Sequence, residues 1–333
     1  MKKKVLVTTG DPDGIGLEVF LKALTQESLT ESLKSVAVVL WCADQEQILK
    51  KNFTSTFNPQ KIFSVSHPNS ANVPQILEAI TQPGVYFILD SRNPALWVQD
   101  AALHCNLNPS NNILVTGPLD KTTIRKAGFS SLGHTGLLAH VTNTSREALT
   151  MFFHGEFFNV VLLTDHISIS NVEHLLVPSL VEKKLNALWD WSQRFYQLLG
   201  YSEHTLFIEE FFGRFLWLGV NPHNGESGLI SFFDQRLFSI IPWKKLLFAI
   251  GGPIVPDTAC VNYRVKGRTT FIANYHDQGL IPFKMAHGFS GSHFTAGLPF
   301  LRISVDHGTA KDIFGKNIAD PSSALSCLRW ALR

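Results

Sequence analysis

Short apolar runs recur along this chain, and nearly every run is followed by a cluster of polar residues. GDPDGIG follows the run Val5–Thr9, GPLDK follows Ile113–Thr116 and DHIS follows Asn159–Thr164. The repeated order of strand, loop and helix indicates an α/β protein with a largely parallel sheet. In open α/β sheets, ligands bind outside the carboxyl ends of the strands. We therefore expect the functional residues in the loops that follow the strands.

The same patterns predict the other main elements. Further strands are expected at Val36–Cys42, Val85–Asp90, Phe215–Val220, Leu246–Ile250 and Thr270–Asn274. Helices are expected from Leu17 onward and at Pro178–Leu199, Leu229–Ile240 and Ser322–Leu332. Ser322 or Ser323 is the expected N-cap of the last helix, because a serine hydroxyl there accepts a hydrogen bond from an unpaired backbone N–H group.

Composition narrows the class of protein. The chain has 333 residues, of which 45% are hydrophobic, so it can bury a large core and is long enough that two lobes are expected rather than one. The net charge of +2 gives no broad basic field, so a nucleic-acid partner is not expected. The four cysteines are far apart and have no CxxC pair, which favours reduced thiols and a cytoplasmic location. No apolar run approaches the roughly 18 residues that cross a bilayer, so no membrane association is expected.

Three histidines each follow a predicted strand: His166, His223 and His276. Imidazole is the commonest neutral metal ligand, and three of them leave a coordination position open for a substrate oxygen. Asp165 and Asp277 sit beside two of these histidines, either as hydrogen-bond partners, as further ligands or as loop caps. The alternative is that the three histidines are partly buried and bond to backbone groups.

Two cations stand among apolar residues in the stretch from 274 to 320. Lys284 follows LIPF, and Arg302 follows GLPFL. Arginine suits bidentate recognition of carboxylate or phosphate, and lysine binds the same anions as a point charge. Gly133, His134 and Thr135 offer a flexible backbone, an imidazole and a hydroxyl for the same purpose. Ordinary structural ion pairs are the alternative.

The glycine-rich loops differ from the familiar nucleotide-binding motifs. GDPDGIG is not GxGxxG, and it fits a tight strand-to-helix turn better than a phosphate cradle. DHGTAKDIFGKN has glycines that allow close backbone approach, and Asp306, His307 and Asp312 supply hydrogen-bonding groups. There is no Walker motif, and the absence of GxSxG gives no support to an α/β-hydrolase.

Eight of these segments, taken in order, resemble the motifs of the PdxA family of 4-hydroxythreonine-4-phosphate dehydrogenases. They are GDPDGIGLE, TGPLDK, GHTGLLA, TDHISI, NPHNGE, GPIVPDT, YHDQGLIPFK and GLPFLRISVDHGTAKDIFGKNIAD. Together they span almost the whole chain, except for about residues 43–110. The last segment also resembles the adenosine-binding loop of isocitrate and isopropylmalate dehydrogenases.

The resemblance implies a fold and a reaction. The fold would be the two-lobed isocitrate/isopropylmalate dehydrogenase-like fold with largely parallel sheets and a central cleft. Its first lobe would comprise residues 1–125 and 290–333, and its second lobe residues 126–289. The enzyme would oxidise 4-phosphooxy-L-threonine with NAD, and loss of carbon dioxide would then give 3-amino-2-oxopropyl phosphate for pyridoxal phosphate (pyridoxine) biosynthesis. It would be a homodimer whose subunits share the active site.

The resemblance also implies roles for particular residues. A divalent zinc, magnesium or cobalt ion would be bound by His166, His223 and His276. The phosphorylated substrate would contact His134, Thr135, Lys284, His293 and Arg302. The cofactor would contact Gly10, Asp11, Asp306, His307, Gly308, Thr309, Asp312 and Asn317. The general base stays open between Asp257, Lys121 and a metal-bound water.

This chain departs from the family pattern at several positions. Gly136 replaces a carboxylate in the GHTE motif, and His293 replaces a substrate-contacting asparagine. Asp120 replaces an asparagine, and Lys311 and Phe314 are unusual in the cofactor loop. These departures leave open a dehydrogenase acting on a related phosphorylated hydroxy acid, such as a phosphothreonate or phosphoerythronate. Two further hypotheses are a phosphate acyltransferase-like enzyme and a binding protein without catalytic activity.

Overall fold

The computed structural model describes residues 3–43, 60–65, 72–130, 133–242, 247–261 and 268–333. The chain folds into two compact units, one made of residues 1–146 and 298–333 and the other of residues 147–297. Both units combine helices with largely parallel strands, which confirms the predicted α/β class. The lobe limits given above stay predictions, since these units are defined by compactness alone.

The first unit has a parallel sheet with the strand order β3-β4-β2-β1-β5-β12. Its strands are β1 (Lys4–Thr8), β2 (Ala37–Cys42), β3 (Lys61–Val65), β4 (Gly84–Asp90), β5 (Asn112–Thr116) and β12 (Leu301–Val305). In β1, Val5 pairs with Val38 on one side and with Ile113 on the other. All three side chains are buried, as expected for the central strands of a parallel sheet that is covered on both faces.

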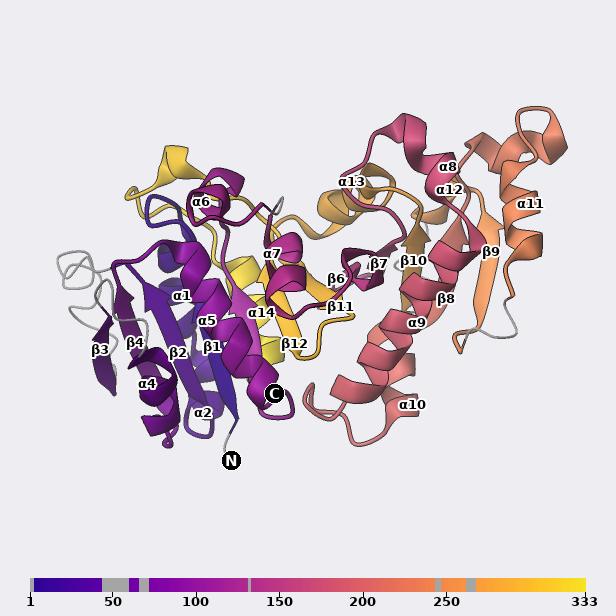
Figure 1. The fold of residues 1–333 in the computed structure, drawn as a ribbon. Coiled ribbons are helices and arrows are strands. Elements are labelled where there is room, and N and C mark those ends of the chain that lie inside the picture. The colour runs from indigo at the N-terminus through magenta and orange to yellow at the C-terminus, as the bar shows by residue number, and fades with distance from the viewer. Residues whose placement is uncertain (1–2, 44–59, 66–71, 131–132, 243–246, 262–267) are drawn as a thin grey trace. The chain divides into compact units, whose positions relative to one another are not determined.

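Helices of the first unit cover this sheet (Figure 1). They are α1 (Gly16–Leu24), α2 (Thr30–Leu33), α4 (Val73–Ala79), α5 (Pro94–Leu107), α6 (Lys121–Lys126), α7 (His134–Val141) and α14 (Ser322–Ala331), with the short 3₁₀ turns η1 (Glu27–Leu29) and η8 (Lys311–Ile313). The turn η3 (Arg146–Ala148) spans the sequence boundary between the two units. Helix α5 packs on β1 and β5, while α14 packs on β5 and β12 and against α1. This packing fixes the strand ends from which the polar loops emerge.

The second unit has the strand order β11-β6-β7-β10-β8-β9. Its strands are β6 (Thr150–His154), β7 (Asn159–Leu162), β8 (Arg214–Leu218), β9 (Ile250–Ile254), β10 (Thr269–Ala273) and β11 (Ser292–Ala296). Strand β6 runs antiparallel to both of its neighbours, whereas β7, β10, β8 and β9 are parallel. The carboxyl ends of these four strands therefore lie along one edge.

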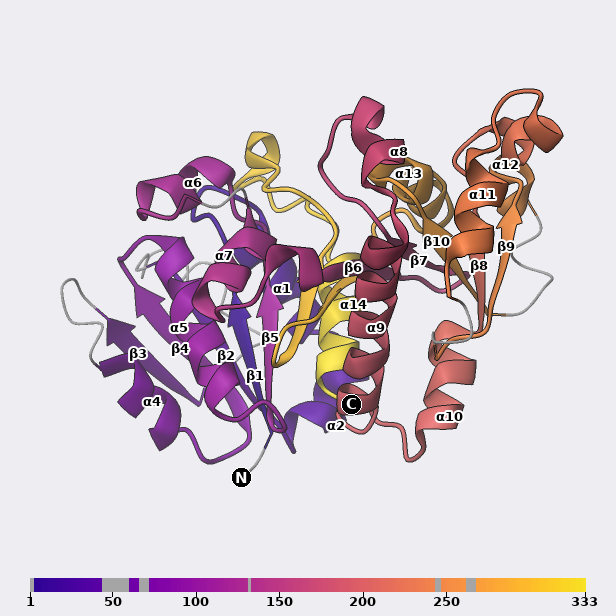
Figure 2. The same ribbon diagram turned by 45° about the vertical axis from the view of Figure 1, so that its right-hand side comes forward.

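Aromatic side chains fill the core of the second unit, where Figure 2 shows α9 as the long helix. Phe152 of β6 stacks on Phe294 of β11 at 5.0 Å and meets Trp191 of α9 edge-on at 4.8 Å. Such pairs add to the free energy of burial when the rings are offset or perpendicular. The helices and turns are α8 (Val172–Leu175), α9 (Pro178–Phe195), α10 (His204–Phe207), α11 (Phe233–Ile240), α12 (Pro256–Ala259), α13 (His276–His287), η4 (Ile169–Asn171), η5 (Ile208–Phe212) and η6 (Pro222–Gly228).

Three sequence predictions are wrong in detail. A strand is expected at Leu246–Ile250. Residue 246 lies outside the described residues, and of the others only Ile250 is in a strand. Strand β9 instead continues from Ile250 through Gly251 to Ile254, which pair with β8. The helix expected from Leu229 begins at Phe233. The N-cap of α14 is Pro321 rather than a serine, and the carboxylate of Asp320 accepts the Ser322 N–H bond at 2.8 Å.

Candidate functional site

Three polar loops meet at the carboxyl ends of β1, β5 and β12 in the first unit. The backbone N–H of Asp11 donates to the carbonyl of Pro118 at 3.0 Å, which joins the GDPDGIG loop to the GPLDK loop. The N–H of Ile15 donates to the carbonyl of Thr309 at 3.0 Å, which joins GDPDGIG to DHGTAKDIFGKN. The chain thus builds one continuous loop surface from segments that are far apart in sequence.

Glycines make this close approach possible. Gly10 has a φ of +89°, and a Cβ there would lie 1.9 Å from the carbonyl oxygen of Pro118. A Cβ on Gly16 would lie 1.7 Å from the carbonyl oxygen of Thr9. No real side chain tolerates such distances, so both positions require glycine. The geometry agrees with the tight strand-to-helix turn that the sequence favoured.

The carboxylate of Asp11 is already engaged inside the protein. One of its oxygens accepts the N–H of Asp120 and the other accepts the hydroxyl of Thr123, both at 2.7 Å. Asp11 is also almost fully buried. These bonds assign it a role in holding the loops together, and direct contact with a cofactor stays a prediction for Gly10 and Asp11.

The DHGTAKDIFGKN loop leaves polar groups available to a ligand. His307 bonds through Nδ1 to the carbonyl of Gly308 at 2.9 Å, and its Nε2 is shielded from solvent without a hydrogen-bond partner among the described residues. Asp312 and Asn317 are exposed, and Gly308 has open space around it. A buried ring nitrogen that lacks a partner is costly, so it points to a bound polar group.

Lys311, which departs from the family pattern, lies between two of these loops. Its Nζ is 2.9 Å from Asp13 Oδ2 and 3.9 Å from Asp120 Oδ2. The hydrogen bond to Asp13 raises the pKa of Lys311. The pKa of Asp120 is lowered, first by hydrogen bonds from Thr122 and after these by the charge of Lys311. All three charged side chains are substantially exposed, so their attraction is screened.

A buried cation and a neutral imidazole lie in the same unit. Arg302 on β12 is 1% exposed, and its Nη2 donates to Thr116 Oγ1 at 2.7 Å. Burial lowers the pKa of Arg302 to about 9. Burial and then the charge of Arg302 lower the pKa of His134 to about 3, and His134 Nε2 is buried without a hydrogen-bond partner among the described residues. Thr135 follows His134 at the start of α7, so three of the five predicted substrate-binding residues belong to one unit.

Two of the three candidate metal ligands lie together in the second unit. The rings of His166 and His276 are 5.4 Å apart, centroid to centroid. They meet because β7 and β10, the strands that precede them, are parallel neighbours. His276 bonds through Nδ1 to Asp277 Oδ1 at 2.6 Å, which leaves its Nε2 for a metal.

The third candidate, His223, does not complete a metal site within the chain. The part of the chain that the structure describes contains no group of three His, Cys, Asp or Glu side chains that could hold one metal ion. His223 lies in η6, and its Nδ1 bonds to Glu226 Oε1 at 2.7 Å. That bond raises the pKa of His223, and the negative charges of Glu226 and then of Asp257 raise it further. The predicted base Asp257 therefore lies within electrostatic reach of His223.

The loop that carries His223 has an unusual backbone. Residues 223–227 all have positive φ values between 46° and 79°. Left-handed backbone costs about 1–2 kcal/mol per residue with a side chain. The carboxylate of Asp234, which is 3% exposed, holds the start of this loop by accepting the N–H group of Val220 and, at 3.1 Å, that of Asn221. Such strain is concentrated at functional sites.

The remaining predicted site residues are more scattered. Lys284 is exposed on α13, about two helical turns from His276. His293 is buried on β11 and stacks on Phe153 of β6 at 4.7 Å. Lys121 is exposed at the first position of α6. Thr116 and Asp234 were not singled out from the sequence, because their roles arise from contacts between distant segments.

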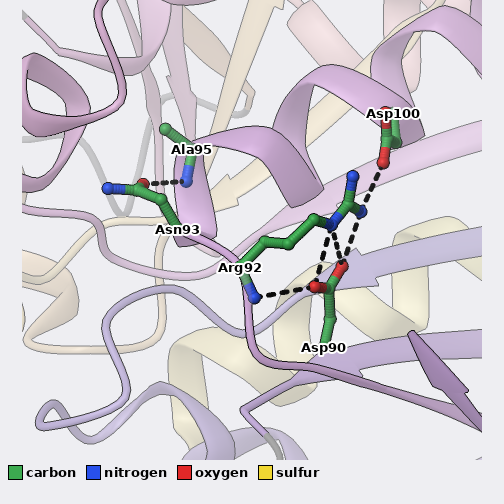
Figure 3. A network of polar contacts seen from close by, with 5 residues as sticks. All are labelled: Asp90, Arg92, Asn93, Ala95 and Asp100. Atoms are coloured by element: carbon green, nitrogen blue, oxygen red, sulfur yellow. Dashed lines mark hydrogen bonds and ion pairs between the residues drawn. The ribbon is translucent and has the colours of Figure 1, made fainter. Parts of the chain in front are cut away.

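A buried ion network lies at the carboxyl end of β4 (Figure 3). Arg92 Nη2 is 2.6 Å from Asp90 Oδ2 and 2.6 Å from Asp100 Oδ2. Asp90 is fully buried and Arg92 is 7% exposed. The Asn93 side chain caps α5 by accepting the Ala95 N–H bond at 2.9 Å. The network anchors the loop from β4 to α5, within the part of the chain that carries no recognisable motif.

Polar loops after parallel strands, a buried guanidinium and paired histidines are features of an α/β enzyme whose candidate site lies at the strand ends. The family model described as pyridoxal phosphate biosynthetic protein PdxA matches residues 37–331. The chain belongs to this PdxA family. In the described residues, no helix is both long and apolar enough to cross a bilayer.

Curated relatives and a solved structure agree with this assignment. A 4-hydroxythreonine-4-phosphate dehydrogenase of Aquifex aeolicus is 33% identical, with 99% of this chain and 97% of the relative covered. A D-threonate 4-phosphate dehydrogenase of Pectobacterium atrosepticum is 29% identical, with 100% of this chain and 99% of the relative covered. The crystal structure of a 4-hydroxythreonine-4-phosphate dehydrogenase from Klebsiella pneumoniae has a TM-score of 0.73 at 29% identity, with 100% of this chain and 99% of that chain covered.

Proposed function

We propose that this protein oxidises the 3-hydroxyl of 4-phosphooxy-L-threonine with NAD. The product, 2-amino-3-oxo-4-(phosphooxy)butanoate, then loses carbon dioxide to give 3-amino-2-oxopropyl phosphate for pyridoxal phosphate biosynthesis. The observation that carries the proposal is the buried guanidinium of Arg302 beside the neutral imidazole of His134, in a chain that matches such dehydrogenases over nearly its whole length.

The phosphate of the substrate is the natural partner for these groups. A guanidinium without bulk water gains strongly from a bound anion, because the low local dielectric strengthens the attraction. His134 Nε2 lacks a hydrogen-bond partner among the described residues, and a neutral ring with its proton on that atom donates to a phosphate oxygen. Thr135 belongs to the same unit. Contacts of Lys284 and His293 with the substrate are implied by the family resemblance alone. Holding the remote phosphate orients C3 for hydride transfer.

The donor set of the second unit fits a divalent metal. His166 and His276 offer two imidazoles 5.4 Å apart, and a carboxylate holds Nδ1 of His276. Imidazole ligands favour zinc or cobalt over magnesium, which prefers oxygen ligands. When bound, such a metal polarises the hydroxyl that is oxidised and the ketone that forms. His166 and His276 would hold it together with the partner subunit's His223.

Exposed apolar residues beside the histidines support a homodimer. Leu229 and Phe232, just after the His223 loop, are 87% and 67% exposed, and Met285 of α13 is 84% exposed. Large exposed apolar side chains on one unit are typical of a surface that another molecule covers. In the proposed homodimer, a second copy would bury these residues and bring its own His223 to the pair of His166 and His276. The proposed enzyme acts in the cytoplasm without nucleic-acid or membrane partners.

The chain's own residues then have defined tasks. The loops at β1, β5 and β12 hold NAD through Gly10, Asp11 and the segment from Asp306 to Asn317, with Asp306, His307, Gly308, Thr309 and Asp312 as its contacts. The proton of the 3-hydroxyl passes to Asp257 or Lys121. A pH–rate profile of Asp257→Asn and Lys121→Met separates these two. A general base must be unprotonated to act, so only loss of the true base removes the fall of kcat on the acidic limb.

A related substrate is the second candidate. Relatives named D-threonate 4-phosphate dehydrogenase are 29% identical to this chain, close to the other relatives. His293 and Gly136 depart from the pattern of the 4-hydroxythreonine-4-phosphate enzymes, and these departures support a changed preference at the carbon chain rather than at the phosphate.

NADH absorbance tests both candidates. The purified protein is given NAD with 4-phosphooxy-L-threonine or with D-threonate 4-phosphate, with and without a chelator, and Arg302→Met serves as the anion-site variant. We expect NADH formation with the threonine derivative that chelator abolishes and Arg302→Met strongly weakens. A clear preference for D-threonate 4-phosphate would identify the related substrate, the second candidate, as the substrate of this enzyme. No NADH with either substrate, in metal-supplemented protein, contradicts the proposed dehydrogenase.

A further inference from the structure

A hydrogen-bonded pair on α1 holds the far end of the proposed cofactor loop. Lys22 Nζ donates to Glu18 Oε1 at 2.8 Å, to the carbonyl of Asn317 at 3.1 Å and to the carbonyl of Ala319 at 2.9 Å. Glu18 Oε1 also accepts the N–H of Ala319 at 2.8 Å. The side chains of Lys22 and Glu18 are 29% and 15% exposed, so water competes only partly for these bonds.

These bonds act on a segment that has one unfavourable backbone conformation and one buried N–H group. Asn317 has a φ of +55°, a left-handed conformation that is unfavourable for a residue with a side chain. Ala319 is 3% exposed, so its N–H group needs a partner inside the protein. Glu18 and Lys22 meet both needs from a helix that is more than 290 residues away in sequence.

We infer that Glu18 and Lys22 are positioning residues for dinucleotide binding: they fix residues 317–319 so that the loop from 306 onward presents its polar groups in the binding conformation. This inference rests on the proposed function, because it takes that loop as the NAD site. The pair does not touch the reacting atoms. Its loss therefore weakens cofactor binding and leaves the chemical step of the loaded enzyme unchanged.

The geometry of the bonds separates this role from a simple ion pair. Glu18 serves as an acceptor for a backbone N–H, and Lys22 serves as a donor to two backbone carbonyls. Reversing both charges, as in Glu18→Lys with Lys22→Glu, keeps an ion pair four residues apart on the helix. The reversed pair, however, places a donor opposite the N–H of Ala319, which needs an acceptor, and an acceptor opposite the carbonyls of Asn317 and Ala319, which need a donor. Charge reversal therefore fails to restore binding, whereas Glu18→Gln and Lys22→Arg keep the hydrogen bonds.

NADH binding and amide exchange of the full-length protein test the inference. For Glu18→Met and Lys22→Met we expect the Kd for NADH, followed by fluorescence, to rise about tenfold, the ratio that corresponds to the loss of one charge-assisted hydrogen bond. The Ala319 amide exchanges faster in both variants without NADH, and KM for NAD rises while kcat is unchanged. Glu18→Gln and Lys22→Arg stay within about threefold of the wild type.

Lys34→Met is the matched control, because Lys34 forms an exposed pair with Glu31 of α2 in the same unit. Its affinity for NADH equals that of the wild type. Wild-type affinity in Glu18→Met and Lys22→Met, or restored affinity in the charge-reversed protein, overturns the inference. If the wild type itself binds no NADH, the proposed cofactor is wrong and the inference falls with it.

Discussion

The loops of the first unit are tied to one another within a single chain, whereas the histidine loops of the second unit are not. Asp11, Ile15 and Lys311 link the loops after β1, β5 and β12 through backbone and side-chain contacts of 2.9–3.0 Å. In the second unit, His166 and His276 pair, but the described residues hold no complete group of three metal ligands. This difference is what the proposed homodimer would explain: one chain would build the cofactor surface alone, and a second copy would supply His223 to the proposed metal site.

Strand neighbours alone do not explain this difference. Strand β10 has β7 on one side and β8 on the other, both parallel to it. His166 and His276 meet across the first of these pairs. His223 follows β8, yet it lies in the left-handed turn of η6 and bonds to Glu226, and among the described residues it forms no group of three ligands with the pair. The local backbone of this turn, and not the strand order alone, therefore sets where the His223 ring lies.

The largest effect is expected where the first unit depends on buried charge. Arg92→Met leaves the carboxylate of Asp90 buried without its cation, so we expect the free energy of unfolding to fall by about 3–5 kcal/mol. Asp100→Asn removes the second carboxylate, which is partly exposed, and is expected to change stability by less than about 1 kcal/mol. Urea denaturation measures both, and equal losses in the two variants would show that the network does not depend on pairing Asp90.

A smaller, pH-dependent effect is expected in the second unit. His287 accepts the N–H of Phe157 at Nε2, 3.0 Å away, and its Nδ1 bonds to the carbonyl of Phe283 at 2.8 Å, so the folded protein holds it neutral. Burial lowers the pKa of His287. The unfolded state therefore binds a proton more readily than the folded state. The stabilisation by neutral His287 is complete above the unfolded pKa of about 6.5 and is lost as the pH falls below that value. The free energy of unfolding then falls by at most about 1.4 kcal/mol per pH unit.

Stability measured from pH 8 to pH 5 in the wild type and in His287→Gln tests this effect. Glutamine is not protonated in this range, so the variant is expected to lose part of the acid dependence. An identical pH dependence in both proteins would assign the acid sensitivity to other groups.

The smallest effect is expected at the exposed contact of Lys311. Its pairs with Asp13 and Asp120 are screened by water, and exposed pairs contribute about 0.2–1 kcal/mol. Lys311→Met is therefore expected to change the Kd for NADH by no more than about fivefold, and the change shrinks as salt is raised. If Lys311→Met weakened NADH binding more than Lys22→Met does, the ranking of the two contacts would be reversed, and Lys311 would be the main link of the loop.

Local patterns predicted the parts of the fold in which sequence and packing agree. The β-branched runs of β1, β2 and β5 are buried on both faces, and their predicted limits differ from the observed ones by a residue. Strand β12 contains Arg302, and α13 contains Gly279 and Pro282, so neither has the uniform pattern of its class. These elements form because their neighbours in the sheet and core require them.

The sequence predicted which residue types of the site lie in the loops after strands, but it did not predict which of them contact one another. The histidines and the anion-binding residues stood out because polar groups after strands are informative. The roles of Glu18, Thr116 and Asp234 depend on single bonds between segments far apart in sequence, and no local pattern encodes them. An acid and a lysine four residues apart on α1 gave the one available signal for Glu18.

Activity of mixed dimers tests the shared metal site most directly. Subunits carrying His223→Ala and subunits carrying His276→Ala are given different tags, and the heterodimer is isolated and assayed for NADH formation beside both parents. If the metal site takes His223 from the second subunit, one of the two sites in the heterodimer has all its ligands, and about half of wild-type activity returns while each parent is inactive. A heterodimer as inactive as its parents would show that His223 acts within its own chain and would contradict the account.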